Sequence, residues 1–210
     1  MVLEHSAVNI LPKLMLHEDS VMEEFELDAD KGEFVSEILR AKDSVWLGRV
    51  KSLRLEQYAI NILPKLKLHE NNVMDTLEIV NVSRDMLQKD SWILNKIKTA
   101  GKVLKALSPL SGDGGLWTTP ADGGCFGWKI KHIKMYNSTV LALQWIRSDK
   151  SCVLDRFEYT HRGKEDVSQW FRFRRVYLGK IKQNGFVVPP SIKKFPSYTL
   201  VDEEGNNPIH

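Results

Sequence analysis

The pattern of apolar and polar residues predicts β-strands in the middle and toward the end of the chain. Residues 65–69 (KLKLH) alternate strictly, which is typical of a strand with one buried face. Residues 139–146 (TVLALQWI) are apolar on both faces and predict a central strand. Asn184-Gly185 is typical of a β-hairpin turn, so we expect the strands on either side of it to pair. The remaining expected strands are residues 152–160, 169–182 and 186–188.

A helical pattern lies between these groups of strands. Across residues 93–107 the apolar side chains recur at steps of three and four, Ser91 is suited to cap the helix, and Pro109 ends it. Residues 108–125 then contain five glycines and two prolines, which predicts a long loop. Together these elements predict an α+β fold, with a mainly antiparallel β-sheet and one or two helices packed on one face.

An internal repeat precedes this core. Residues 3–28 align with residues 55–80 at an offset of 52 and are identical at 15 of 26 positions. A solenoid needs about three units to close its core, so we interpret the repeat as a duplicated strand–helix element. One copy then belongs to the main fold, and the other packs beside it or on a neighbouring molecule. The residues shared by the copies include Asn9/Asn61, Pro12/Pro64, His17/His69 and Met22/Met74.

The charge of the chain is distributed unevenly. The net charge is +3, but residues 1–52 carry −5, residues 53–125 carry +1, residues 126–194 carry +10 and residues 195–210 carry −3. We therefore expect an acidic N-terminal repeat copy (1–52), an α+β core that includes the second copy (53–194), and an acidic tail (195–210). A segment of charge +10 attracts phosphates or acidic partners.

The composition excludes several classes of protein. With 42% hydrophobic residues the chain is too apolar to be disordered, and it contains no run of about 20 apolar residues that would span a membrane. Its first residues lack the pattern of a secretory signal, and its two cysteines are too few for a disulfide framework or a structural zinc site. We therefore expect a reducing compartment, the cytosol or the nucleus.

Motifs for catalysis and metal binding are sparse. Residues 120–126 (PADGGCF) resemble the Asp-Gly-x-Cys segment of ovarian-tumour-type cysteine proteases, which makes Cys125 the candidate nucleophile. In that family a helix follows the cysteine and helps to lower the thiol pKa, whereas the residues after Cys125 have the pattern of a strand. Cys152 is interpreted as a small buried hydrophobe. His17 and His69 recur without a third ligand, so we expect no metal. A Gly-rich phosphate loop, a His-Glu-x-x-His motif and a Gly-x-Ser-x-Gly motif are all absent, and we expect no cofactor and no enzymatic activity.

A cationic sheet face is a more informative feature. On a strand, Arg172 and Arg174 share one face, and the neighbouring phenylalanines lie on the other. A row of arginines on a sheet binds the phosphates of lipid headgroups or of nucleic acid. Because the aromatic rings do not share the arginine face, headgroup or backbone contact is favoured over base stacking. The expected basic face comprises Lys129, Lys131, Lys134, Arg172, Arg174, Arg175, Lys180 and Lys182.

The predicted loop 108–125 has two apolar residues at its middle, Leu116 and Trp117. Tryptophan is favoured at membrane interfaces and in protein contacts, so we expect this tip to contact a membrane or another subunit. The alternative is that Trp117 folds back onto the core of its own chain.

The order of elements in residues 59–188 resembles that of rhabdovirus matrix proteins. Residues 92–112 are similar to the helix that precedes the exposed hydrophobic loop of that family. The resemblance implies a non-enzymatic structural protein that self-associates under a membrane and bridges it to a nucleocapsid. Two family features are absent: Pro189-Pro190 is followed by Ser-Ile where the budding motif has x-Tyr, and the acidic repeat replaces the basic N-terminal arm.

The sequence leads to one main hypothesis and two alternatives. The main hypothesis is a cytoplasmic, peripheral membrane assembly protein, part of the virion if viral, whose partners are its own copies, an anionic membrane and a nucleocapsid or other nucleoprotein. One alternative is an adaptor that binds nucleic acid directly through the basic face, and the other is a cysteine protease centred on Cys125. The acidic residues expected to contact the basic body of a neighbouring copy are Glu18, Asp19, Glu23, Glu24 and Glu26.

Overall fold

The computed structural model describes residues 1–14, 16–17, 19–83, 86, 128–137, 139, 152–161, 177–194 and 196–207. Most of its regular elements are strands and short 3₁₀ helices (η). In chain order they are β1 (Val2–Glu4), η1 (His5–Lys13), β2 (Val21–Ala29), η2 (Gly32–Val35), α1 (Ser36–Arg40), β3 (Val45–Gln57), η3 (Tyr58–Lys65), β4 (Leu66–Leu68), β5 (Val73–Val80), β6 (Lys129–Tyr136), β7 (Val153–Leu154), β8 (Arg156–Thr160), β9 (Tyr177–Lys182), η5 (Gln183–Gly185), β10 (Phe186–Val187) and β11 (Ser197–Val201).

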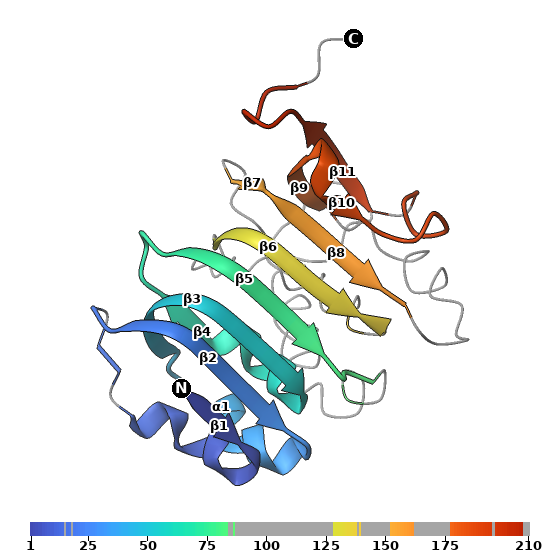
Figure 1. Ribbon diagram of the computed structural model, residues 1–210. Helices are drawn as coiled ribbons and strands as arrows, with labels where there is room; N and C mark the ends of the chain where they lie inside the picture. The colour runs from blue at the N-terminus through green and yellow to red at the C-terminus, as the bar shows by residue number, and fades with distance from the viewer. Residues whose placement is uncertain are drawn as a thin grey trace, which may run out of the picture.

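The strands form parallel sheets. The main sheet has the order β1-β2-β3-β5-β6-β8-β10, with β4 paired to β3, and a smaller sheet has the order β11-β9-β7 (Figure 1). Every strand pair among the described residues is parallel. The predicted mainly antiparallel sheet is therefore wrong, and the fold is α/β-like with few helices. Parallel neighbours require a crossover between strands, which η1, the η2–α1 pair and η3 provide on one side of the sheet.

Five segments of the described chain contain the pattern L-x-x-L-x-L, in which L is an apolar residue that is buried or, at Met22, partly buried. In β3 these residues are Val50, Leu53 and Leu55, all with no exposed surface. Leu53 pairs in register with Phe25 of β2 and with Leu77 of β5, at sequence intervals of 28 and 24 residues. A chain in which each repeat of 20–29 residues contributes one strand and a 3₁₀ or α segment to a parallel sheet has the geometry of a solenoid. The pattern recurs at residues 22/25/27, 50/53/55, 74/77/79, 130/133/135 and 154/157/159.

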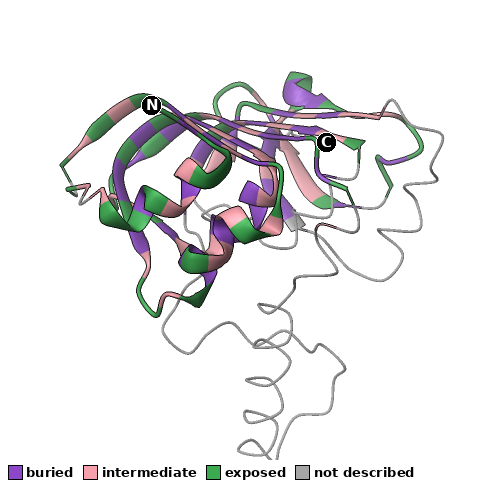
Figure 2. Cartoon of the chain, turned by 90° about the horizontal axis from the view of Figure 1, so that it is seen from below, coloured by how far each residue is buried: buried purple, intermediate pink, exposed green. Residues whose placement is uncertain are grey.

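The core lies on one side of the main sheet. The second and third apolar positions of neighbouring strands stack in rows, for example Leu27, Leu55, Ile79 and Met135, which are all completely buried. η1, η2, α1 and η3 cover this side, as seen in Figure 2. Over β2, β3 and β5 the opposite side of the sheet is not covered by another described element. The sheet therefore has one core face and one open face.

The two repeat copies occupy equivalent places in the same sheet. The first copy forms β1, η1 and β2, and the second forms the end of β3, then η3, β4 and β5. Leu3, Leu27 and Leu55 pair in succession, so the 52-residue offset spans two solenoid units rather than one. The repeated element is strand–3₁₀–strand, and the sheet also contains strands outside the two copies, whose sequences are less similar.

The strand predictions at 65–69, 152–160 and 186–188 are confirmed in position by β4, β7 with β8, and β10. The described end of the 169–182 prediction forms β9. The predicted hairpin at Asn184-Gly185 is wrong, because β10 pairs in parallel with β8 and not with β9. Gly185 serves a close approach instead, since a Cβ there would lie 1.9 Å from the carbonyl oxygen of Asp155. The helix predicted at 93–107, the loop 108–125 and most of the strand at 139–146 lie outside the described residues.

Candidate functional site: the open face and rim of the sheet

Successive strands alternate in the sign of their charge at the first x position of the L-x-x-L-x-L pattern. The distance between neighbouring strands, about 4.8 Å, suits ion pairs across them. Lys51 Nζ lies 2.9 Å from Glu23 Oε1, Lys131 Nζ lies 2.7 Å from Asp75 Oδ1, and Lys182 Nζ lies 2.7 Å from Asp155 Oδ1. We call this set the paired row: Glu23, Lys51, Asp75, Lys131, Asp155 and Lys182.

The paired row is electrically balanced within the chain. The hydrogen bond from Lys131 to Asp75, together with the negative charge of that carboxylate, raises the pKa of Lys131. The hydrogen bond from Lys182 to Asp155 likewise raises the pKa of Lys182, and Glu203 lies 3.8 Å from the same ammonium group. The ion pairs are compatible with this order of the strands, and each lysine of the row already has a carboxylate partner within the chain.

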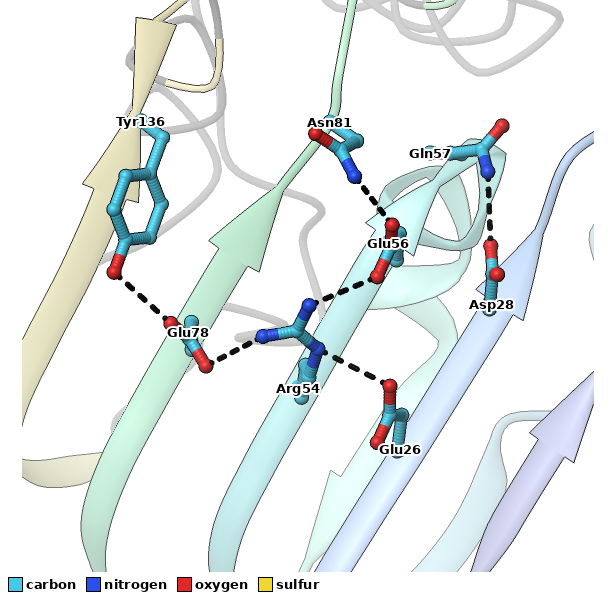
Figure 3. A network of polar contacts seen from close by, with 8 residues as sticks. All are labelled: Glu26, Asp28, Arg54, Glu56, Gln57, Glu78, Asn81 and Tyr136. Atoms are coloured by element: carbon cyan, nitrogen blue, oxygen red, sulfur yellow. Dashed lines mark hydrogen bonds and ion pairs between the residues drawn. The ribbon is translucent and has the colours of Figure 1, made fainter. Parts of the chain in front are cut away.

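The open face has an arginine at its centre. Arg54 of β3 lies between β2 and β5 and donates to three carboxylates (Figure 3). Its Nε lies 3.1 Å from Glu26 Oε1, its Nη2 lies 3.0 Å from Glu56 Oε2, and its Nη1 lies 2.8 Å from Glu78 Oε2. One guanidinium thus faces three carboxylates, which leaves this cluster with a formal charge of −2.

Neutral side chains extend the Arg54 cluster on both sides (Figure 3). The Tyr136 hydroxyl donates to Glu78 Oε1 at 3.1 Å, Asn81 donates to Glu56, and Gln57 Nε2 donates to Asp28 Oδ1 at 3.2 Å. Partial burial and this hydrogen bond raise the pKa of Tyr136. Partial burial and the charge of Glu56 raise the pKa of Asp28. These contacts hold the carboxylates in fixed positions on the sheet.

The open face is acidic at one end and nearly neutral at the other. On β2, β3 and β5 its outward positions carry five carboxylates and one guanidinium, a formal charge of −4. On β6 and β8 they carry two cations and one carboxylate, a formal charge of +1. Burial lowers the pKa of His132, and the charges of Lys134 and Arg156 lower it further. The five carboxylates are Glu24, Glu26, Asp28, Glu56 and Glu78.

A second surface crosses the strands at the residue before the first apolar position of the pattern. This residue is the first of β2, β5, β6 and β7, but it lies inside β3 and β9. The register pairs Val21 with Arg49, Val73 with Lys129, and Val153 with Lys180. Val21 is 58% exposed and Val73 is 45% exposed. Among the residues that the structure describes, no carboxylate forms an ion pair with the three cations of this set. We call it the rim: Val21, Arg49, Val73, Lys129, Val153 and Lys180.

The predicted basic residues do not share one surface. Lys129 and Lys180 lie on the rim, Lys131 and Lys182 in the paired row, and Lys134 on the open face between Glu78 and Glu158 in register. Arg172, Arg174 and Arg175 lie outside the described residues, as do Leu116, Trp117 and Cys125.

The predicted acidic residues also divide between surfaces. Glu23 belongs to the paired row, and Glu24 and Glu26 belong to the open face. Asp19 lies in the turn before β2, where its N–H donates to His17 Nδ1 at 3.3 Å. Glu18 is outside the described residues.

The two repeated histidines have a structural position. His17 Nδ1 accepts from the N–H of Asp19, and His69 Nδ1 accepts from the N–H of Asn71 at 3.1 Å. Within the described part of the chain, no group of three or more His, Cys, Asp or Glu residues is placed to hold a metal ion. Cys152 is half-buried, and its thiol lies 3.5 Å from the carbonyl oxygen of Ile130. Among the helices that the structure describes, none combines the length and the hydrophobicity of a membrane span.

Sequence reasoning missed Arg49, Arg54 and Tyr136. A signal for the first two was present, because the strand sequences alternate between an acidic form, VMEEFEL and VMDTLEI, and a basic form, RVKSLRL and KIKHIKM. Aligning these four segments would have placed Arg49 with Lys129 and Arg54 with Lys134. No protein family, curated protein or solved structure matches the chain, so the surfaces themselves must indicate its function.

Proposed function

We propose that this protein is a non-enzymatic recognition scaffold whose open face binds a cationic segment of a partner protein. The observation that carries the proposal is the formal charge of −4 on the uncovered side of β2, β3 and β5. Solenoids present extended surfaces of this kind to their partners.

The arrangement of the carboxylates supports binding rather than mere solubility. Arg54 and the neighbouring amide and hydroxyl groups hold Glu26, Glu56 and Glu78 in place, so little side-chain entropy is lost when a cation approaches. Because these groups are only partly exposed, their attraction for a cation is screened less than that of fully exposed charges.

The test uses a labelled oligolysine peptide and the full chain, with fluorescence anisotropy measured at several salt concentrations. We expect binding that weakens as salt rises, and a loss of about tenfold in affinity for the double variant Glu24→Gln/Asp28→Asn. The matched control is Glu33→Gln/Glu37→Gln, which removes two charges from η2 and α1 on the other side of the sheet. Equal weakening by both variants would refute binding at the open face.

A second candidate function is the assembly role that the sequence suggests, on an anionic membrane or a nucleoprotein. Its support is now the rim, because Arg49, Lys129 and Lys180 form no ion pair with a described carboxylate. The acidic open face of one copy would then contact the rim of the next, which gives a head-to-tail assembly. The resemblance to rhabdovirus matrix proteins, which suggested this assembly role, stays a prediction.

Two variants separate this candidate from the first. Arg49→Gln/Lys129→Gln removes charge from the rim only, and Glu24→Gln/Asp28→Asn removes it from the open face only. If copies assemble head to tail, each variant alone stays monomeric in light scattering, and their mixture forms a dimer that does not grow.

Flotation with phosphatidylserine vesicles tests the membrane role, and direct binding of RNA tests the adaptor role. Selective reaction of Cys125 with an electrophile tests the protease alternative.

A further inference from the structure

The rim repeats every two strands. Valine and a cation alternate along it, so one valine–cation pair occupies two neighbouring repeats. Within the main sheet, where strands are about 4.8 Å apart, Arg49 of β3 and Lys129 of β6 are about 9.6 Å apart, and Val73 of β5 lies halfway between them. Val153 and Lys180 continue the same order on the smaller sheet. This surface is separate from the open face. Its cations are not neutralised by the carboxylates of the paired row, because Glu23, Asp75 and Asp155 form ion pairs with the lysines of that row.

The spacing selects one kind of secondary structure in a partner. An α-helix advances 1.5 Å per residue, so residues seven apart on one face are about 10.5 Å apart, and a residue three or four positions on lies midway on the same face. An extended strand presents a side chain to one face about every 6.8 Å, which does not match a 4.8 Å alternation. A polyproline helix presents only one residue per turn of about 9.3 Å.

We propose that the rim binds an amphipathic α-helix of a partner protein, laid across the strands along the rim residues. The helix carries an acidic residue every seven positions and an apolar residue three or four positions after each one. Its carboxylates face Arg49, Lys129 and Lys180, and its apolar side chains cover Val21, Val73 and Val153. Burying these valines favours the bound state, because the first two are about half exposed in the free chain.

The described part of the chain does not itself supply such a helix. The one α-helix there, α1, has five residues, which is less than a heptad, and it lies on the covered side of the sheet. The acidic residues of the open face are on strands and do not have the helical spacing.

The test uses a synthetic peptide of three heptads with Glu at the first position, Leu at the fourth and Ala or Gln elsewhere. We expect the full chain to bind it in fluorescence anisotropy, and Arg49→Glu/Lys129→Glu to weaken binding at least about tenfold. A peptide with Lys in place of Glu should bind this double variant better than it binds the wild type. The matched control Lys13→Glu/Lys31→Glu makes the same charge change on η1 and next to η2, and should bind like the wild type.

Two further arms decide between a helix and other ligands. A peptide of the same composition with each Leu moved to the opposite face should bind at least about tenfold more weakly, because the valines would remain exposed. Val73→Asp should cause a similar loss for the original peptide, while circular dichroism shows an unchanged fold. Equal binding of both peptides, or tighter rim-dependent binding of an oligonucleotide or of phosphatidylserine vesicles, would overturn the proposal. These outcomes are independent of oligolysine binding at the open face.

Discussion

The side chain of Asn72 forms the two hydrogen bonds with the backbone of Val50 that a neighbouring strand would otherwise form. Its Oδ1 accepts from the Val50 N–H at 2.9 Å, and its Nδ2 donates to the Val50 carbonyl oxygen at 3.1 Å. Asn72 is 7% exposed, and Val50 is fully buried. At the equivalent place in the first copy, the Arg49 N–H donates to the backbone oxygen of Ser20 instead. Ser20 and Asn72, which are equivalent in the two copies, thus both bond to the backbone of β3, one through its backbone oxygen and the other through its side chain.

Replacing Asn72 by Ala should destabilise the protein by about 2 kcal/mol, because it leaves a buried N–H and a buried carbonyl without a partner. The measurement is urea unfolding followed by circular dichroism. Asn71→Ala, at an exposed neighbouring position, should change the free energy of unfolding by less than about 0.5 kcal/mol. Equal effects of the two substitutions would contradict the role assigned to Asn72.

Removing Arg54 should destabilise the protein because three carboxylates then face one another without a cation. We expect Arg54→Met to cost about 1–2 kcal/mol in the free energy of unfolding, less than a fully buried pair would, since the Arg54 side chain is 35% exposed. Adding Glu56→Gln to Arg54→Met should recover part of the loss, because Glu56 is the least exposed of the three, at 15%. No recovery in the double variant would show that the loss arises from packing of the arginine stem instead.

Reversing a charge in the paired row should act through both neighbouring strands. Lys51→Glu places a carboxylate between Glu23 and Asp75, so we expect a lower melting temperature than for Lys51→Gln. The difference between the two variants should shrink in about 1 M NaCl, because the charges are exposed and screened. A difference that does not depend on salt would argue against an electrostatic origin.

His132 should make the protein less stable as the pH falls. Burial and neighbouring cations lower its pKa below the ordinary value of 6.5, so the unfolded chain takes up a proton before the folded chain does. Stability is therefore fully present above about pH 6.5 and declines as the pH falls toward the lowered folded pKa. His132→Gln should reduce the loss of melting temperature between about pH 7 and pH 5. An unchanged loss would show that other groups set this part of the pH dependence.

Local patterns along the chain predicted the positions of several strands but not their partners. The alternation at 65–69 and the apolar residues at 152–160 and 186–188 correspond to β4, β7 with β8, and β10. The direction of pairing was missed, because alternation reports which residues are buried and is the same for parallel and antiparallel neighbours. Asn184-Gly185 was misleading because the glycine is required by a close approach to the Asp155 carbonyl oxygen. This contact joins residues 30 positions apart, so the local sequence does not reveal it.

The sequence by itself determined the internal duplication, the uneven charge and the apolar positions that become the core. Only the tertiary structure decided which charges remain available. Lys129 and Lys131 are two residues apart, yet Lys131 bonds to Asp75 and Lys129 lies on the rim opposite Val73. The physical reason is that the charge of a lysine is neutralised by the residue opposite it on the neighbouring strand. That residue is distant in sequence, and the register of the parallel sheet places its strand about 4.8 Å away.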